Sequence, residues 1–324
     1  MTSIIMIGAL ALAAQQTDTT FAVRPNGTAA VEVFQGSVKV GSWDRAQLRV
    51  VARHSSRNEV DINTVGSRVE IEIAGRWGIG QAELELTVPR AFGLSIQGVN
   101  TPIDVQGVEG DLTLETVNGD VTVRGARGRL QAESVQGLVT IEDSNGRISA
   151  SSMNRGVRIR NSGGEFHVEA VNGPVLLHGI DARRVDAETV NGAVEYDGTI
   201  YADGSYSLAS HNGRVAIAIP ENAGARVSVY TFNGKLSTSF PIEIGGQQAK
   251  VLAPDAPRPP EQPRQPRGVR PPAPPPPPES PHRGRYIFTI GNGGATIELE
   301  SFGGAIQLVR PGELTRRNPE TRER

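Results

Sequence analysis

Residues 115–173 read ETVNGDVTVRGARGRLQAESVQGLVTIEDSNGRISASSMNRGVRIRNSGGEFHVEAVNG. Turn signals in this stretch begin at positions 118, 127, 136, 145, 154, 163 and 172, so each lies nine residues after the last. Pairs of apolar residues separated by one polar residue follow the turns, as in Val121/Val123 and Val139/Ile141. This alternation is typical of a strand that buries one face. Each nine-residue unit therefore predicts one short strand and one tight turn.

Asn-Gly pairs such as Asn118-Gly119 mark several of the turns. Both residue types tolerate a positive φ, and we expect this conformation to explain their use. The residue before each turn signal predicts a third inward-facing position. These positions are Val117, Ala126, Val135, Ser144, Met153, Ser162 and Val171.

The outward residues match better at a spacing of 18 than at nine. ETVNG (115–119), ESVQG (133–137), EAVNG (169–173) and ETVNG (188–192) recur at steps of 18, 36 and 19. We therefore predict an all-β, single-chain β-solenoid, β-helix-like, with two short strands per rung and rungs paired at about 4.8 Å. The rung lengthens from 18 to 21 residues between Asn191, Asn212 and Asn233 through a longer opposite turn. A meander of hairpins is the alternative, since Asn-Gly also marks hairpins, but it would not favour identical outward residues at 18.

The rest of the chain divides around these repeats. Residues 1–14 predict a signal peptide with an A-x-A cleavage site at 11–13; a buried first strand is the alternative. The other predicted segments are a less regular β-rich N-terminal cap (15–98), solenoid repeats (99–252), a proline-rich disordered insertion (253–284), final solenoid strands (285–310) and a disordered tail (311–324). The repeat returns after the insertion, in Ile297/Leu299 and Ile306/Leu308, which favours a loop within one solenoid.

Composition narrows the functional classes. A net charge of −2 gives no electrostatic case for nucleic acid as a partner. The absence of cysteine rules out disulfides, thiolate metal sites and cysteine nucleophiles. Residues 4–14 are too few to span a bilayer, which needs about 20 apolar residues, so we do not expect an integral membrane protein.

The V-N-G-x-V/I-x-V/I units resemble those of the bacterial "putative adhesin" β-strand-repeat family, a domain of unknown function related to the head GIN domain of autotransporter adhesins. GSVKVGSWDRAQLRVVA (36–52) and LTVPRAFGLSIQGVNTPIDV (86–105) share this resemblance. The resemblance covers roughly residues 20–252 and 285–309. It implies an extracytoplasmic β-solenoid without established catalytic residues, and the proline-rich insertion departs from the pattern.

Two rows of charged residues are candidate sites. Glu115, Glu133, Glu169 and Glu188 precede their turns at equivalent positions, with Ser151 in the gap. This row predicts either a solvated acidic edge or a site for divalent cations or a basic partner, because hard cations prefer carboxylate oxygens. Arg124, Glu142, Arg160 and His178 form a second row at steps of 18 on the opposite face. We interpret that row as a ladder of surface ion pairs; the alternative is a strip that binds or cleaves a glycan.

An Asn/Gln ladder is predicted to be internal and structural, because stacked amides hydrogen-bond along the axis. Its members are Asn118, Gln136, Asn154, Asn172, Asn191, Asn212 and Asn233. No catalytic, cofactor or metal motif is present, and Gly75 to Gly80 is interpreted as a glycine-rich loop. The proline-rich insertion predicts polyproline II conformation, and it serves either as a spacer or as a segment for an anionic polymer or a partner protein. Its arginines are Arg258, Arg264, Arg267, Arg270, Arg283 and Arg285, against the acids Asp255, Glu261 and Glu279.

The sequence thus predicts a non-enzymatic exported protein of the cell envelope, periplasmic or on the cell surface, with no cofactor. Its repetitive β-surface would serve binding or assembly with an envelope component or a protein partner. A polysaccharide-binding or polysaccharide-cleaving β-helix protein is one alternative, and a self-polymerising scaffold is the other.

Overall fold

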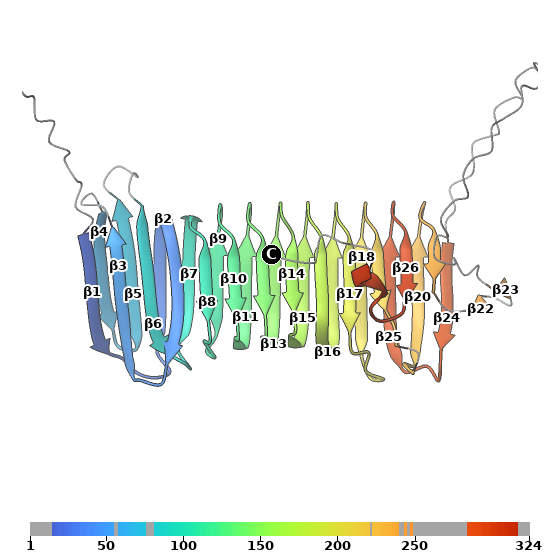
Figure 1. Ribbon diagram of the computed structural model, residues 1–324, viewed down its shortest axis with the longest axis horizontal. Coiled ribbons are helices and arrows are strands. Elements are labelled where there is room, and N and C mark those ends of the chain that lie inside the picture. Colours follow the sequence, from blue (N-terminus) through green and yellow to red (C-terminus); the bar gives the residue numbers. More distant parts are fainter. Residues whose placement is uncertain are drawn as a thin grey trace, which may run out of the picture.

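The computed structural model describes residues 15–54, 58–75, 81–220, 222–239, 243–244, 247–248 and 284–316. Within these ranges the chain forms 26 strands and one short helix, so the prediction of an all-β protein is confirmed. Twenty-four strands belong to one hydrogen-bonded network that extends along a single long axis (Figure 1). The predicted signal peptide (1–14), residues 253–283 of the proline-rich insertion and residues 76–80 of the glycine-rich loop lie outside the described ranges.

Successive strands in the middle of the chain alternate between two parallel-stranded sheets, here called sheet I and sheet II. In this part each strand pairs with the next strand but one along the chain, so Leu130 lies beside Ile148 in sheet I and Val139 beside Val157 in sheet II. One strand of sheet I and the neighbouring strand of sheet II are called a level. β2 (Thr28–Trp43) and β16 (Val175–Thr189) are long enough to contribute to both sheets.

In spatial order, sheet I consists of β4 (Asn58–Val65), β5 (Arg68–Gly75), β2, β7 (Gly93–Asn100), β9 (Leu112–Thr116), β11 (Arg127–Ser134), β13 (Asn145–Ser152), β15 (Gly163–Ala170), β16, β18 (Ser205–Ser210), β25 (Ala295–Ser301), β20 (Ala225–Thr231) and β24 (Gly284–Ile290). Sheet II consists of β1 (Gln15–Ala22), β3 (Gln47–His54), β6 (Ala82–Pro89), β2, β8 (Ile103–Gln106), β10 (Val121–Arg124), β12 (Val139–Glu142), β14 (Val157–Arg160), β16, β17 (Val194–Gly198), β19 (Val215–Ala218), β26 (Ile306–Val309) and β21 (Leu236–Thr238). β22 (Glu243–Ile244) and β23 (Gln247–Gln248) pair with each other.

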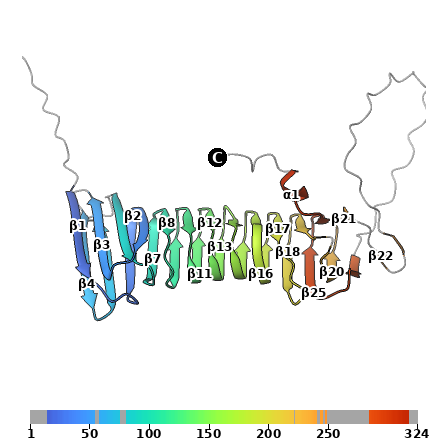
Figure 2. The ribbon, with the colours of Figure 1, turned by 60° about the horizontal axis from the view of Figure 1, so that its bottom comes forward.

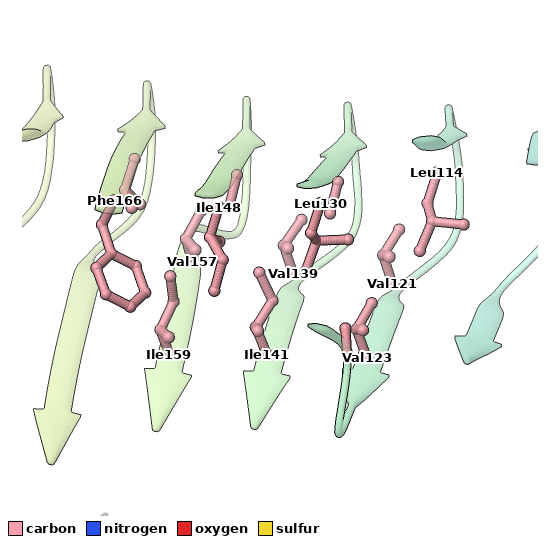
Figure 3. Packing of buried hydrophobic residues seen from close by; sticks show 14 of the residues in the cluster. Leu114, Val121, Val123, Leu130, Val139, Ile141, Ile148, Val157, Ile159 and Phe166 are labelled. Carbon is pink, nitrogen blue, oxygen red and sulfur yellow. The ribbon is translucent and has the colours of Figure 1, made fainter. Parts of the chain in front are cut away.

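The core is a narrow stripe between the two sheets. Inward side chains of sheet I, such as Leu130 and Ile148, meet those of sheet II, such as Val139 and Val157 (Figure 3). These side chains are almost fully buried, and one continuous cluster extends along the whole stack. The alternation of apolar and polar residues that the sequence shows therefore separates core from surface on most levels. β17 and β19 depart from it, because Glu195 and Ala216 at outward positions are also buried.

The two kinds of turn differ in their use of glycine, and the predicted positive φ does not explain the Asn-Gly pairs at the edge where sheet I strands end. Gly137 does not have a positive φ, but a Cβ there would collide with the carbonyl oxygen of Gly119 on the preceding level. Close stacking of turns, rather than φ, therefore requires glycine at this edge. Positive φ occurs instead at the opposite turns, for example at Gly146 (139°) and at Asp143 (51°).

The order of strands in space departs from their order in the chain near the C-terminus. β25 lies between β18 and β20 (Figure 1), and β26 lies between β19 and β21. After β19 the chain therefore skips the neighbouring level of the stack and forms the next one with β20 and β21. Residues 295–309 later occupy the skipped level. The step from Asn212 to Asn233 in the sequence therefore joins two levels that are not neighbours.

The N-terminal part has a similar crossing, because β2 separates β5 from β7 and β6 from β8. Outside these levels, β1, β3 and β4 pair antiparallel with their neighbours, as β24 does at the other end. In the tail that was predicted to be disordered, α1 (Glu313–Arg316) lies beside the stack (Figure 2), and Leu314 packs on Ala216 and Ala218.

Candidate functional site

The edge where sheet I strands end in Asn-Gly turns carries three parallel rows of side chains. The first, the acidic row, has the predicted glutamates in register, since Glu115 pairs with Glu133 and Glu169 with Glu188, with Ser151 between. The structure extends it beyond the predicted set. Its members in spatial order are Glu72, Glu32, Gln97, Glu115, Glu133, Ser151, Glu169 and Glu188.

The second row is apolar and points outward, which corrects the predicted third inward position. Met153 is 50% exposed, Val117 40% and Val171 39%. The row consists of Phe34, Val99, Val117, Val135, Met153, Val171 and Val190. The alternation of the strand continues one residue further than predicted, so that the residue before each of these side chains, except before Val99, is the buried one. At the opposite turn, Ala126, Ser144 and Ser162 are buried as predicted.

The buried residues that immediately precede the apolar row carry a row of hydroxyl groups that was not predicted from the sequence. Ser134 Oγ donates a hydrogen bond to the Gly119 carbonyl of the preceding level (2.8 Å) and accepts one from the Gly137 N–H (2.8 Å). Thr116, Ser152, Thr189, Ser210 and Ser301 make equivalent bonds to carbonyl oxygens. The recurrence of Ser or Thr two residues before Asn or Gln is the signal that could have revealed the row.

The acidic and apolar rows together line a groove of about 890 Å³, here called the edge groove. It crosses β5, β2, β7, β9, β11, β13 and β15, from Glu72 and Phe34 at one end to Glu169 and Val171 at the other. The same two kinds of side chain recur on successive levels, so the groove offers a repeated chemistry along its length.

The acidic row is not neutralised by neighbouring cations. Within the described ranges, no Lys or Arg forms an ion pair with a glutamate of this row. In the part of the chain that the structure describes, Glu169 alone of these glutamates forms an ion-pair contact with a basic side chain, His167, at 2.9 Å. Among the described residues, no group of three or more acidic or histidine side chains is arranged to hold a metal ion.

The row predicted on the opposite face differs, because its charges pair with each other. Glu142 lies 3.1 Å from Arg124 and 3.8 Å from Arg160. His178 is 4.0 Å from Glu195, which is buried and also contacts Arg214. Burial lowers the pKa of His178 below its ordinary value, although the Glu195 carboxylate opposes this shift.

The third row holds the predicted amides, and it lies at the surface. Asn212 donates to Asn191, Asn191 to Asn172 and Asn172 to Asn154, at 2.9 to 3.2 Å. Asn118 donates instead to Asn100, at 2.8 Å. The side-chain amide of Asn154 donates a hydrogen bond to the Val135 carbonyl rather than to the side chain of Gln136. Asn233 is separated from Asn212 by the level that contains Gly303.

Aromatic rings continue the line of the apolar row towards the C-terminal levels. His211 stacks on Phe302 with ring centroids 4.8 Å apart, and Phe302 stacks on Phe232 at 4.6 Å. The ring planes are almost parallel, at 6° and 3°, because equivalent positions of successive levels repeat along the axis. The edge thus presents one apolar line beyond the groove itself.

No protein-family model and no curated protein matches this chain. Solved structures with some similarity are described as a "putative cell adhesion protein" of Clostridium sporogenes (TM-score 0.24), a "putative adhesin" of Parabacteroides merdae (0.41) and a "putative adhesin" of Bacteroides fragilis (0.38). Each is 10% identical, and they cover 91%, 64% and 91% of this chain and 100%, 89% and 97% of their own. At this identity and these TM-scores, the likeness assigns neither family nor function.

No helix in the described ranges has the length and apolar character needed to cross a bilayer.

Proposed function

We propose that the protein is an exported, non-enzymatic binding protein of adhesin-like type, coiled as a β-solenoid with two strands in each turn of the coil. Its edge groove holds an elongated partner along the axis of the coil. The observation that carries this proposal is the continuous groove in which an acidic and an exposed apolar row repeat level after level. Exposed apolar side chains that form a contiguous line mark interaction surfaces in soluble proteins.

The repetition favours binding over catalysis. A catalytic site places a few different groups around one reacting atom, whereas the levels of this groove offer nearly the same groups at each step of about 4.8 Å. A ligand with a repeating structure can use all of them. The unneutralised carboxylates favour a partner with positive charges, and the apolar row favours one that also has apolar surface.

Removal of the apolar row tests this function. V117S/M153S/V171S takes away side chains that are exposed, so the fold should survive. Each loses apolar contact worth about 1 kcal/mol on binding, so affinity should fall by at least tenfold. T122A/T140A, on the outward face of sheet II, is the matched control.

The assay is an array of glycans, including amino sugars, together with purified envelope polymers and basic proteins. We expect the wild-type protein and the control to bind the same members, and the groove variant to lose them. Equal binding by the groove variant, or cleavage of a bound polymer, would contradict the proposal. Fractionation of the producing cells tests export separately, with the periplasm or cell surface as the expected location.

A further inference from the structure

The edge groove combines two rows that run side by side along the stack. On most of its strands, a residue of the acidic row and one of the apolar row are separated by a single buried residue, as Glu169 and Val171 are by Ala170. Two residues of a strand advance about 7 Å. A partner that lies along the axis therefore meets a line of carboxylates and, about 7 Å to its side, a line of apolar side chains.

The spacing of the levels selects the conformation of a polypeptide partner. Neighbouring levels are about 4.8 Å apart, so alternate levels are about 9.6 Å apart. A polyproline II helix places every third residue on one face, and it advances about 9.3 Å over three residues. An α-helix advances about 5.4 Å in each turn, and an extended strand repeats its facing side chains every ~6.6 Å. Neither of these matches one level or two.

Alternate levels of the acidic row carry hydrogen-bond acceptors at this spacing. One set of alternate positions consists of Glu72, Gln97, Glu133 and Glu169. All four line the groove, and three of them are acidic. Six strand pairings lead from Glu72 to Glu169, or about 29 Å. Nine residues of polyproline II advance about 28 Å, so four cations at every third residue reach all four positions.

The charge and the apolar surface of the groove complement such a partner. Within the described ranges, no Lys or Arg of the chain pairs with the carboxylates of this set. Glu133 accepts a hydrogen bond from the side-chain amide of Gln131 at 2.8 Å, which leaves its negative charge in place. The exposed side chains of the apolar row, such as Met153, offer contact to proline rings.

We propose that the partner of the edge groove is a basic, proline-rich polypeptide in the polyproline II conformation, with a cationic side chain at every third residue. This inference rests on the proposed function and specifies its partner. The cations meet the carboxylates of alternate levels, and the proline rings on the adjoining face cover the apolar row. Because polyproline II is extended before it binds, the partner loses little conformational entropy in the groove.

A synthetic peptide of four Pro-Pro-Arg units tests the spacing with the full-length protein. The matched control peptide, PRPRPRPRPPPP, has the same composition, but its arginines recur at every second residue and point to different faces of the helix. We expect the Pro-Pro-Arg peptide to bind at least tenfold more tightly than the control in fluorescence anisotropy at low ionic strength. Equal affinities or no binding would overturn the proposal, and so would equally tight binding of an amphipathic α-helix with four arginines.

Two protein variants with equal changes in net charge show where the peptide binds. E115Q/E133Q/E169Q removes three carboxylates of the acidic row, whereas D104N/E109Q/D143N removes three that do not line the groove. We expect the first variant to weaken binding of the Pro-Pro-Arg peptide at least fivefold and the second less than twofold, because only the first removes ion pairs with the peptide. Equal losses would overturn the proposal, since net charge alone would then attract the peptide.

The result is separable from that of the array that tests the proposed function. If the array finds a glycan that needs the groove while the Pro-Pro-Arg peptide does not bind, this inference fails and the proposed function stands. If the peptide binds wild type and loses affinity for E115Q/E133Q/E169Q and for V117S/M153S/V171S, both stand.

Discussion

The buried hydroxyl of Ser134 predicts a measurable loss of stability when it is removed. Its Oγ satisfies a carbonyl of the preceding level and an N–H of its own turn, both at 2.8 Å, and Ser134 is 4% exposed. A buried hydrogen bond contributes about 0.5–1.5 kcal/mol net, and an orphaned buried group costs more. S134A should therefore lower the free energy of unfolding by about 2–3 kcal/mol. Urea unfolding followed by circular dichroism measures the change, with midpoints compared at a common slope.

Two further variants make this prediction specific. Ala170 occupies the same position of the row without a hydroxyl, so A170S should raise the free energy of unfolding by up to about 1 kcal/mol. Ser149 faces outward on β13, and S149A should change it by less than about 0.5 kcal/mol. If S134A unfolds at the wild-type midpoint, or if S149A loses as much, the hydroxyl row does not stabilise the stack as argued.

Three further predictions follow from other features. G137A should cost at least about 2 kcal/mol in urea unfolding, because its Cβ meets the Gly119 carbonyl; a smaller loss would show that the turn can shift. Burial lowers the pKa of His178 in the folded protein, so unfolding binds a proton and its contribution to stability declines as pH falls through the ordinary value of about 6.5. H178Q should lose less stability than wild type between pH 8 and pH 5. An equal loss of unfolding free energy in the two proteins would contradict this. Truncation after residue 284 leaves β20 and β21 without the strands that β25 and β26 provide, so sedimentation velocity should show association through open edges, and a purely monomeric product would count against it.

The regular middle of the fold was predictable because its signals are local. Leu130 and Ala132, or Val139 and Ile141, alternate with polar residues, and the alternation alone determines which face is buried. The acidic row was predictable for the same reason, since Glu115 and Glu133 occupy equivalent positions of successive repeats and stack in register. The apolar row was not, because a valine just before a turn does not reveal whether the strand has already ended. Val117 would have been inward if the strand had stopped one residue earlier.

The sequence by itself therefore determined the all-β class, the strand alternation, the inward side chains within the regular strands and the four glutamates at the centre of the acidic row. Tertiary structure decided the order of levels at both ends, including the place of β25 and β26 between levels that the chain had already formed. The physical reason is that a parallel strand edge accepts any strand with matching alternation, so nearest-neighbour pairing carries little information about order. Only the assembled stack also decided that Val117, Met153 and Val171 form one exposed line beside the carboxylates, and that line makes the edge a groove.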